Sequence, residues 1–330
     1  MSIITLAHGG GGTLQNNLIR REILRYFNAP ELSSLPDGAL TSENLVISTD
    51  SFVITPRFFP GGDIGKLAVA GTVNDVLVSG GIPRYLTCSL IIEEGLELAE
   101  LQKILHSMAE CAQESGVSIV TGDTKVVPRG SGDGLYINTT GIGFKRPGIE
   151  LDRQRFADGD KILVSGHIGA HGLSVLARRF QLDCNSLQSD CAPLTAVVEA
   201  LLSSAGSELK FMRDATRGGV LGVTSEIFEN APCGAVVYQE QLPMLPETAA
   251  IAKLLGIDPG FAACEGCLVA VIGSSAADAV LAAWHAVPGC EKAAVIGSVN
   301  NTCGQLMLEN SWGSRRQLVV PSGDQLPRIC

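Results

Sequence analysis

Three acidic residues stand where predicted strands or helices end in polar turns. They are Asp50 in Ser48-Thr49-Asp50-Ser51, Asp75 in Thr72-Val73-Asn74-Asp75, and Asp123 in Thr121-Gly122-Asp123-Thr124-Lys125. Carboxylates at separate loop ends, with Lys125 close to one of them, suit a Mg²⁺ ion shared with a nucleoside triphosphate, because Mg²⁺ takes oxygen ligands and usually keeps several waters. A single Asp at such a position is more commonly a cap or turn residue. The three motifs together favour a metal–phosphate site.

Two glycine-rich segments are candidates for binding phosphate. The first, Gly9-Gly10-Gly11-Gly12, follows His8, and glycine allows backbone N–H groups to approach an anion closely. A flexible leader has the same composition, and His8 could either contact phosphate or cap this segment. The second, 61–66, is close to a P-loop, but Pro60 occupies the place of its first glycine and Leu67 that of the metal-binding hydroxyl. We therefore reject a P-loop.

The segment 213–219 is a third candidate for binding phosphate. It reads Arg213-Asp214-Ala215-Thr216-Arg217-Gly218-Gly219 and is expected to open a helix. The free N–H groups of that helix, with Arg217, could receive phosphate charge. An ordinary capped helix with surface arginines explains the same pattern equally well.

Cys330 closes the sequence, after Pro327-Arg328-Ile329. A thiol on a terminal tail can carry a covalently attached group from one site to another, and its thiolate form is the reactive one. The α-carboxylate should oppose ionisation of this thiol, and Arg328 should assist it. The ten residues from Pro321 onward can reach on the order of 30 Å when extended. The alternative is a frayed terminus that happens to end in Cys.

Two further patterns resemble metal sites but have simpler explanations. Cys264-Glu265-Gly266-Cys267 is formally a CxxC motif, yet no second CxxC completes a zinc set, so packing at the start of a strand explains these cysteines better. His167 and His171 have the spacing of metal ligands on a helix, but no Glu follows the first as in HExxH, and Gly169 weakens the helix.

The composition is that of a globular chain with two domains. The chain has 330 residues, 45% of them hydrophobic, and a formal net charge of −10, which argues against nonspecific binding of nucleic acid but not against nucleotides. No apolar run is long enough to cross a bilayer. Ten cysteines without a secretory signal indicate reduced thiols. We expect a cytoplasmic enzyme with neither a nucleic-acid nor a membrane partner.

Alternating apolar patterns predict an α/β chain, with a linker over 147–159. A helix capped by Asp63 is expected to run to about Ser79, and a strongly amphipathic one follows over 98–112. Further helices are expected near 169–180, 193–204, 217–230, 247–255 and 276–287. Strands are expected at 44–49, 84–92, 117–120, 135–144, 161–165, 235–238, 268–272 and 294–299, and less strongly at 306–308 and 317–320. A doubly wound parallel sheet is the default for such alternation.

Several of these segments together resemble one known family. The resemblance is carried by Ala7-His8-Gly9, Ser48 to Ser51, Phe58 to Gly62, Gly65 to Ala68, Asn74-Asp75-Val76, Thr121 to Val127, Arg213 to Gly219, Ala263 to Gly266 and Pro327 to Cys330. Over essentially its whole length the chain resembles HypE, the carbamoyl dehydratases that mature nickel–iron hydrogenases. The tail is the most specific element, because the Asp motifs are shared with selenophosphate synthetase and thiamine-phosphate kinase.

The resemblance implies a fold of two α/β domains like that of aminoimidazole ribonucleotide synthetase, with N-terminal sheets that pair across a homodimer. It divides the chain into a Gly-rich leader (1–40), an N-terminal domain for ATP binding and dimerisation (41–150), a C-terminal α/β domain (151–320) and a mobile tail (321–330). The thiol would receive a carbamoyl group from a HypF-type carbamoyltransferase. ATP would drive dehydration of this thiocarboxamide to a thiocyanate, and the cyano group would pass to iron on a HypC–HypD scaffold.

The resemblance also implies roles for single residues. Cys330 would carry the substrate, Glu265 would act as base, and Lys125 would orient the thiocarboxamide or bind phosphate. Mg²⁺ would be held by Asp50, Asp75 and Asp123. ATP would be bound by His8, Gly9, Gly10, Gly11, Gly12, Lys66, Asn74, Thr124, Asp214 and Arg217.

Two other functions fit the same motifs. One is a kinase or synthetase of the same superfamily that acts on a diffusible substrate and has no need of Cys330. The other is a noncatalytic assembly factor whose ATP site controls docking. Three acidic motifs at separate loop ends favour catalysis over the second.

Overall fold

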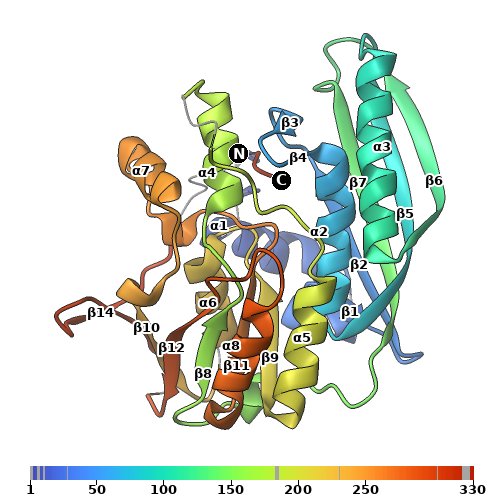
Figure 1. The fold of residues 1–330 in the computed structure, drawn as a ribbon. Helices are drawn as coiled ribbons and strands as arrows, with labels where there is room; N and C mark the ends of the chain where they lie inside the picture. Colours follow the sequence, from blue (N-terminus) through green and yellow to red (C-terminus); the bar gives the residue numbers. More distant parts are fainter. Residues whose placement is uncertain are drawn as a thin grey trace.

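The structure is a computed structural model that describes residues 3–5, 8–9, 12–27, 29–182, 186–229, 231–302, 304–321 and 328–330. The chain forms two sheets, which lie side by side with helices between them (Figure 1). Short helical segments precede the first sheet: α1 (Gly12–Asn17), a π-helix at Leu18–Ile23, and 3₁₀ turns at Leu24–Tyr26 and Pro30–Ser34.

The N-terminal sheet has five strands in the order β1-β2-β7-β5-β6. Their bounds are β1 (Ala39–Leu40), β2 (Leu45–Phe52), β5 (Gly81–Glu93), β6 (Ser118–Val127) and β7 (Leu135–Lys145), and a small hairpin, β3 (Phe58–Phe59) with β4 (Gly62–Asp63), stands apart. Helices α2 (Ile64–Val78) and α3 (Leu98–Ser115) cover one face of this sheet (Figure 1).

Helix α2 is buried on nearly every side. Thirteen of its fifteen residues are buried. It packs on the N-terminal sheet and α3 on one side, and on β9 (Leu209–Asp214) and α5 (Thr195–Ala205) of the C-terminal half on the other. A helix that is apolar all round is typical of such an interior position. Asp63 caps it as predicted, accepting hydrogen bonds from the N–H groups of Gly65 and Lys66 at 2.7 and 3.0 Å.

The C-terminal sheet has seven strands in the order β14-β13-β10-β12-β8-β11-β9. The strands are β8 (Lys161–Val164), β9 (Leu209–Asp214), β10 (Gly234–Tyr238), β11 (Leu268–Ile272), β12 (Ala294–Asn300), β13 (Leu306–Glu309) and β14 (Arg315–Gln317). The helices are α4 (Ala170–Arg179), α5 (Thr195–Ala205), α6 (Gly219–Phe228), α7 (Pro246–Leu255) and α8 (Ala277–His285).

Alternation along the C-terminal strands feeds two cores. In β11, Leu268, Ala270 and Ile272 face the helices α4, α5 and α8, whereas Val269 and Val271 face α6. The first of these cores also contains the buried side chains of α2 and of the N-terminal strands, such as Phe52 and Ile137. The two halves therefore share one continuous apolar core.

The two-domain fold is confirmed, but the default of a doubly wound parallel sheet is wrong. Among the described strand pairs, β5–β6 and β10–β13 are parallel, and every other pair is antiparallel. The reason is visible in the first sheet. β7 inserts between β2 and β5, antiparallel to both, so these two mutually parallel strands are not neighbours. An alternation of helices and strands along the sequence does not reveal such an insertion.

Candidate functional site

A cavity of about 440 Å³ lies between the leader, the end of β2 and the C-terminal half. Residues from both halves line it, and Figure 1 shows the C-terminus between them. Its charged and nucleophilic lining residues are Glu31, Asp37, Asp50, Asp75, Arg213, Asp214, Arg217, Glu226, Glu265 and Cys330.

Three carboxylates in this cavity converge to form a candidate cation site. Asp37 precedes β1, Asp75 lies in the last turns of α2, and Asp214 ends β9; one oxygen of each lies within 4.8 Å of the others. Oδ2 of Asp214 is buried without a hydrogen-bond partner among the described residues. A set of hard oxygen ligands with an unsatisfied buried oxygen fits Mg²⁺.

Hydrogen bonds and an ion pair fix two members of this cluster. The hydroxyl of Ser48, on β2, lies 2.5 Å from Oδ2 of Asp75 and 2.7 Å from the backbone carbonyl oxygen of Asp37, and it can donate its one proton to either of them. Arg213 pairs with the carboxylate of Asp37 at 2.6 Å and with Glu226 at 2.8 Å. The cluster is therefore built from the ends of three elements and held together by Ser48 and Arg213.

Mutual repulsion and burial hold protons on these carboxyls. Burial, and then the charge of Asp37, raises the pKa of Asp214 to about 8. Burial, with the neighbouring charge of Asp214, raises the pKa of Asp75 well above its usual range. Burial also raises the pKa of Asp37, although Arg213 opposes the effect. A bound cation would replace these protons and remove the repulsion.

Cys330 reaches the cavity at the end of a docked tail. The N–H groups of Val53 and Thr55 donate to the carbonyls of Cys330 and Arg328 at 3.2 and 3.3 Å, so the tail pairs with the segment that follows β2. The side chain of Ile329 is buried in the shared core. Negative charge at Cys330 is the largest cause of the raised pKa of Arg217, which lines the same cavity.

Glu265 is a buried carboxyl beside this terminus. Its side chain is 3% exposed, and its Oε1 has no hydrogen-bond partner among the described residues. Burial raises its pKa well above the usual range; the charges of Asp214 and Asp190 add to this, and Arg217 opposes it. Oδ2 of Asp190 accepts the N–H groups of Glu265 and Gly266 at 3.2 and 3.1 Å and so fixes the loop. Such a carboxyl is a candidate for proton transfer in the cavity.

The cavity thus brings together six residues that the sequence singled out: Asp50, Asp75, Asp214, Arg217, Glu265 and Cys330. The motif of β6 is elsewhere. Asp123, Thr124 and Lys125 are exposed, and Asp123 pairs with Lys125 at 2.7 Å on the surface rather than with the acidic cluster. That ion pair and the N–H of Thr124 lower the pKa of Asp123.

Two further predicted nucleotide contacts, Lys66 and Asn74, do not line the cavity either. Nζ of Lys66 lies 3.4 Å from the carbonyl of Gly61. Asn74 is buried, and its amide donates to the carbonyl of Ala192 at 3.1 Å and accepts from the N–H of Leu194 at 2.7 Å. Its observed contacts join the two halves of the chain.

In the leader, His8 Nδ1 lies 2.9 Å from the hydroxyl of Thr5, and Gly9 precedes the start of α1 at Gly12. Gly10 and Gly11 lie outside the described residues. Other leader residues line the cavity instead, namely Gln15, Asn16 and Ile19. The leader therefore covers the cavity with its helical segment.

Sequence reasoning missed two residues of the site. Asp37 stands in Pro36-Asp37-Gly38, which has the composition of an ordinary turn. Asp190 lies in an irregular segment whose role follows from its contact with the loop of Glu265.

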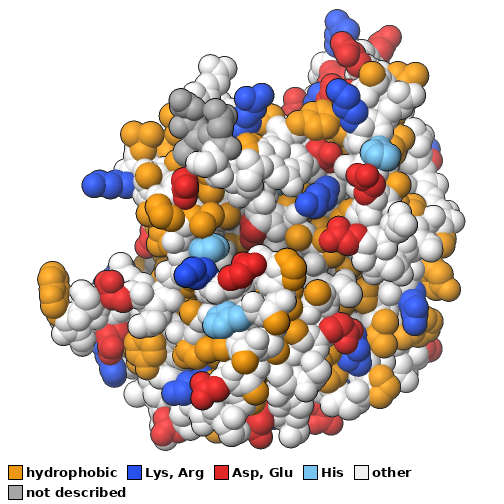
Figure 2. Space-filling model, viewed as in Figure 1, with side chains coloured by type: hydrophobic (Ala, Val, Ile, Leu, Met, Phe, Trp, Pro, Cys, Tyr) orange, Lys and Arg blue, Asp and Glu red, His pale blue; other side chains and the backbone are white. Residues whose placement is uncertain are grey.

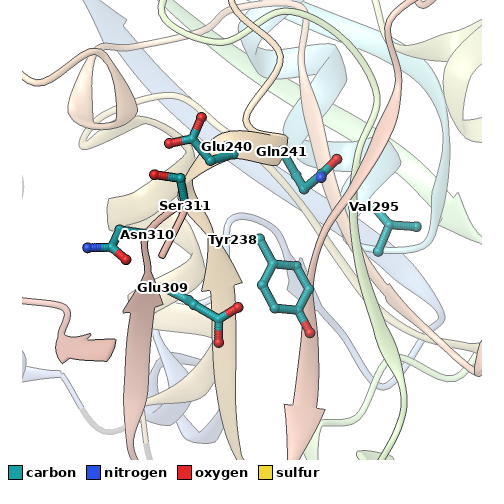
Figure 3. A pocket seen from close by; sticks show the side chains of 7 residues that line it. All are labelled: Tyr238, Glu240, Gln241, Val295, Glu309, Asn310 and Ser311. Carbon is teal, nitrogen blue, oxygen red and sulfur yellow. The ribbon is translucent and has the colours of Figure 1, made fainter. Parts of the chain in front are cut away.

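A second cavity, of about 510 Å³, lies at the ends of β10 and β13 and shares no lining residue with the first. Figure 3 shows its side chains, among them Tyr238, Glu240 and Glu309. Glu309 is engaged by Arg315 at 2.7 Å, and the hydroxyl of Tyr238 lies 2.8 Å from that of Ser298. None of the motif residues lines it.

The surface carries charges of both signs, interspersed on the face in Figure 2. Within the described part of the chain, no helix is long and apolar enough to span a bilayer.

Comparison with known proteins agrees with the fold. The family model for the N-terminal domain of AIR synthase related proteins matches residues 37–144, and that for their C-terminal domain matches residues 157–307. Two α/β domains that enclose an acidic cavity, with both family models matched in order, define a protein of the AIR synthase related class.

Full-length relatives narrow this class. The carbamoyl dehydratase HypE of Escherichia coli (strain K12) is 44% identical over 339 aligned positions, which cover 100% of both chains. The structure of a HypE–HypF complex superposes with a TM-score of 0.88 at 40% identity, covering 92% of this chain and 99% of that one. A HypE structure in complex with ATP has a TM-score of 0.83 at 42% identity, covering 98% and 99%. The chain belongs to the HypE family of carbamoyl dehydratases.

Proposed function

We propose that the protein uses ATP to dehydrate a carbamoyl group on its own Cys330 and so supplies cyanide for the iron centre of a nickel–iron hydrogenase. The observation that carries the proposal is that Cys330 lines the same cavity as the acidic cluster and Glu265. A thiol that only terminated a frayed tail would have no reason to lie there. Membership of the HypE family, and a relative of this family solved with ATP, support the same reading.

The reaction needs a phosphoryl acceptor, a proton acceptor and neutralisation of negative charge. The amide oxygen of the S-carbamoyl group attacks the γ-phosphorus of ATP, ADP leaves, and the carbon–oxygen bond becomes easy to break. The nitrogen loses its two protons as phosphate departs, which leaves a thiocyanate on the sulfur. In its ionised form, Glu265 would accept one proton from this nitrogen and the departing phosphate would take the other, while Arg217 would neutralise charge that develops at the phosphate.

We assign the metal site to Asp37, Asp75 and Asp214, with Asp50 in the same cavity. When Mg²⁺ is bound there, it would neutralise the phosphates of ATP. This revises the set suggested by the sequence, in which Asp123 stood in place of Asp37 and Asp214.

We further propose a homodimer in which β6 forms part of the interface. β6 is an edge strand exposed along nearly its whole length, with Val120 and Val126 56% and 68% exposed. A long exposed edge with apolar side chains is a ready surface for pairing with a second chain. Asp123 and Lys125 on this strand would then complete the cavity of the partner subunit, which explains why they lie away from their own.

The proposed partners follow from the chemistry of the thiol. A HypF-type carbamoyltransferase would load Cys330, and a HypC–HypD scaffold would accept the cyano group; a relative of this chain has been solved as a HypE–HypF complex. We place the protein in the cytoplasm, where thiols stay reduced. Among the described cysteines, Cys88, Cys111, Cys191, Cys264, Cys267 and Cys290 are free thiols, which supports this location.

The deciding experiment follows the mass of the C-terminal peptide. The protein is incubated with the carbamoyl donor system and then with Mg²⁺ and ATP, and cleaved before Asp324. We expect gain of a carbamoyl unit on Cys330 and then loss of one water, with both changes abolished in Cys330→Ala. ATP turnover that persists in Cys330→Ala would instead indicate a diffusible substrate. ATP binding without loss of water would indicate an assembly factor.

A further inference from the structure

The tail is held in the cavity by a set of contacts that differ in burial. Residues 328–330 pair with residues 53–55 through two backbone hydrogen bonds, and Ile329 is buried in the shared core. Arg328 has a left-handed backbone, with φ of 57°, so the tail turns sharply where it enters. A left-handed conformation is disfavoured for a residue with a side chain, so contacts must hold the turn in place.

Two side chains of α4 bind the tail from the inner side. Nε2 of His171 lies 2.9 Å from the carbonyl oxygen of Ile329, and Nη2 of Arg179 donates to the carbonyl of Arg328 at 2.9 Å. Arg179 also donates to the carbonyl of Thr55 at 2.6 Å and so bridges the tail and its pairing segment. These contacts bind the backbone of the tail; His171 is fully buried, whereas Arg179 is partly exposed.

Asp133 binds the tail from the outer side. Its Oδ2 forms an ion pair with the guanidinium of Arg328, whose Nε also donates to the carbonyl of Val53 at 3.1 Å. The side chains of Arg328 and Asp133 are 34% and 45% exposed, so this pair meets solvent, unlike the hydrogen bond of the buried His171. Asp133 does not line the cavity.

The loop that presents Asp133 is itself held in place. Nη1 of Arg57 donates to the backbone carbonyl of Asp133 at 3.1 Å, and Arg57 is paired with Glu100 at 2.7 Å. The N–H of Gly134 donates to Glu93 at 2.8 Å. The carboxylate of Asp133 therefore meets Arg328 from a fixed position.

We propose that Asp133 is a positioning residue for the tail. Through its ion pair with Arg328 it sets the fraction of molecules in which Cys330 is docked in the cavity rather than released to solvent. A tethered substrate must leave the cavity to be loaded or unloaded by another protein, so the holding contacts must be strong enough to dock the tail and weak enough to release it. A solvent-exposed ion pair of modest strength meets this need, whereas the buried contact of His171 and the partly buried contacts of Arg179 recognise the backbone of the tail. The inference rests on the proposed function for its purpose, but the docking itself does not depend on it.

The test measures how fast Cys330 is alkylated by iodoacetamide in the full chain, followed by mass spectrometry of the C-terminal peptide. Asp133→Asn keeps the size of the side chain and removes its charge. We expect alkylation about 1.5- to fivefold faster than in the unmodified protein, the range for loss of a partly exposed ion pair. Asp133→Glu should restore most of the protection. Glu94→Gln removes an exposed carboxylate from the turn after β5 and should leave the rate unchanged.

Salt separates an electrostatic role from a structural one. Raising the ionic strength should speed alkylation of the unmodified protein toward the rate of Asp133→Asn, and should change the variant little. The buried thiols of Cys264 and Cys267 serve as internal controls for unfolding, because they should stay unlabelled in every sample. Equal alkylation rates in the two proteins, with the same salt response, would overturn the proposal.

A second readout links docking to the reaction. In protein already carbamoylated on Cys330, Asp133→Asn should slow the loss of water in a single turnover in proportion to the fall in the docked fraction, which is smaller than the fold-rise in alkylation when most tails are docked. Carbamoyl loading should not be slowed. If no carbamoyl adduct forms in any variant, the proposed function fails, yet the alkylation experiment still decides whether Asp133 docks the tail.

Discussion

Nε2 of His171 donates a hydrogen bond to the carbonyl oxygen of Ile329, 158 residues further along the chain, over 2.9 Å. A carbonyl oxygen only accepts, so Nε2 carries the proton, and in the neutral imidazole Nδ1 must then accept from the hydroxyl of Ser189, 2.8 Å away. The sequence presented His171 as half of a weak metal pattern. In the fold, His171 links Ser189 to the tail that bears the thiol. The next residue, Asp190, holds the loop of Glu265.

The first prediction concerns pH and His171. Burial lowers the pKa of His171 to about 4, below its ordinary value of 6.5. Between these values the unfolded chain binds the extra proton, so this residue costs stability as the pH falls from 6.5 toward 4. His171→Gln, which retains a donor, should therefore gain about 2 kcal/mol relative to the unmodified protein when the pH is lowered from 7.5 to 5.

Urea denaturation at the two pH values measures this difference. Burial raises the pKa of Asp190 to about 6, which gives a slope of the opposite sign, but that slope is common to both proteins and cancels in the comparison. A stability difference that is the same at pH 7.5 and pH 5 would contradict the assignment of a neutral, buried His171.

The second prediction concerns the acidic cluster. Burial and the charge of Asp214 favour the protonated form of Asp75. Replacement of Asp75 by Asn should therefore increase the stability of the metal-free protein. We expect Asp75→Asn to raise Tm by about 1.5–3 °C, which corresponds to about 1–2 kcal/mol for a chain of 330 residues. The same variant should lose the stabilisation by Mg²⁺ and ATP, which amounts to about 2.7 kcal/mol at a hundredfold excess over Kd.

Thermal unfolding with and without Mg²⁺ and ATP checks both effects. Asp158→Asn, at an exposed loop position, is the matched control and should change neither value by more than a fraction of a degree. If Asp75→Asn lowers Tm in the absence of metal, or is stabilised normally by Mg²⁺ and ATP, the cluster is not the cation site.

The third prediction concerns the loop of Glu265. A Cβ atom at Gly266 would lie 1.9 Å from the carbonyl oxygen of Asp190, so Gly266→Ala must push the two segments apart. We expect a loss of about 1–3 kcal/mol in unfolding free energy, in the range for overpacking a rigid site. Loss of water from the carbamoylated thiol should slow as well, because the displaced loop carries the proposed base.

Gly222→Ala provides the comparison. A Cβ atom there would meet open space, and the position lies inside α6. Alanine should stabilise the helix by up to about 1 kcal/mol and leave the reaction unchanged. Equal stability of the two variants in urea would show that the contact between Gly266 and Asp190 is not tight.

The fourth prediction concerns the exposed motif on β6. If Lys125 serves the cavity of the partner subunit, Asp75→Asn and Lys125→Ala lie in different halves of each shared site. Mixing the two inactive proteins and allowing subunits to exchange should then restore activity in about a quarter of the sites, because half of the dimers are mixed and one site in each is intact.

The control is a mixture of Asp75→Asn with Glu265→Gln, both of which lie in the same cavity. Their mixed dimers contain no intact site, so activity should stay absent. Recovery in neither mixture would place Lys125 in its own subunit's cavity or outside the site altogether.

Local signals in the sequence predicted single helices and strands better than they predicted which elements pack together in the fold. Asp63 and the apolar residues after it gave α2 within a residue of its observed bounds, because a cap acts over one helical turn. β9 was missed, since Lys210 and Arg213 interrupt its apolar pattern, and its partner β11 lies far away in sequence. The end of β9 is also where Asp214 joins the cluster.

The site shows the same division. Asp75, Glu265 and Cys330 were recognised from motifs and do line one cavity. Asp37 and Asp190 were missed because each has an ordinary local setting, and their importance comes from residues that only the fold brings near. Asp123 has the stronger local motif, but it sits on an exposed edge, where a second chain would be needed to give it a role.

The shared core means that neither half of the chain should fold without the other. Side chains of β2, α2 and β7 pack in the same cluster as those of α4, α5 and α8. Separating the two halves of the chain would therefore expose two large apolar surfaces to water. The halves should melt together in one calorimetric transition, and either half expressed by itself should precipitate. A chimera that joins one half to the complementary half of a distant homologue should fail to fold unless α2 and the residues that pack on both of its sides come from the same protein.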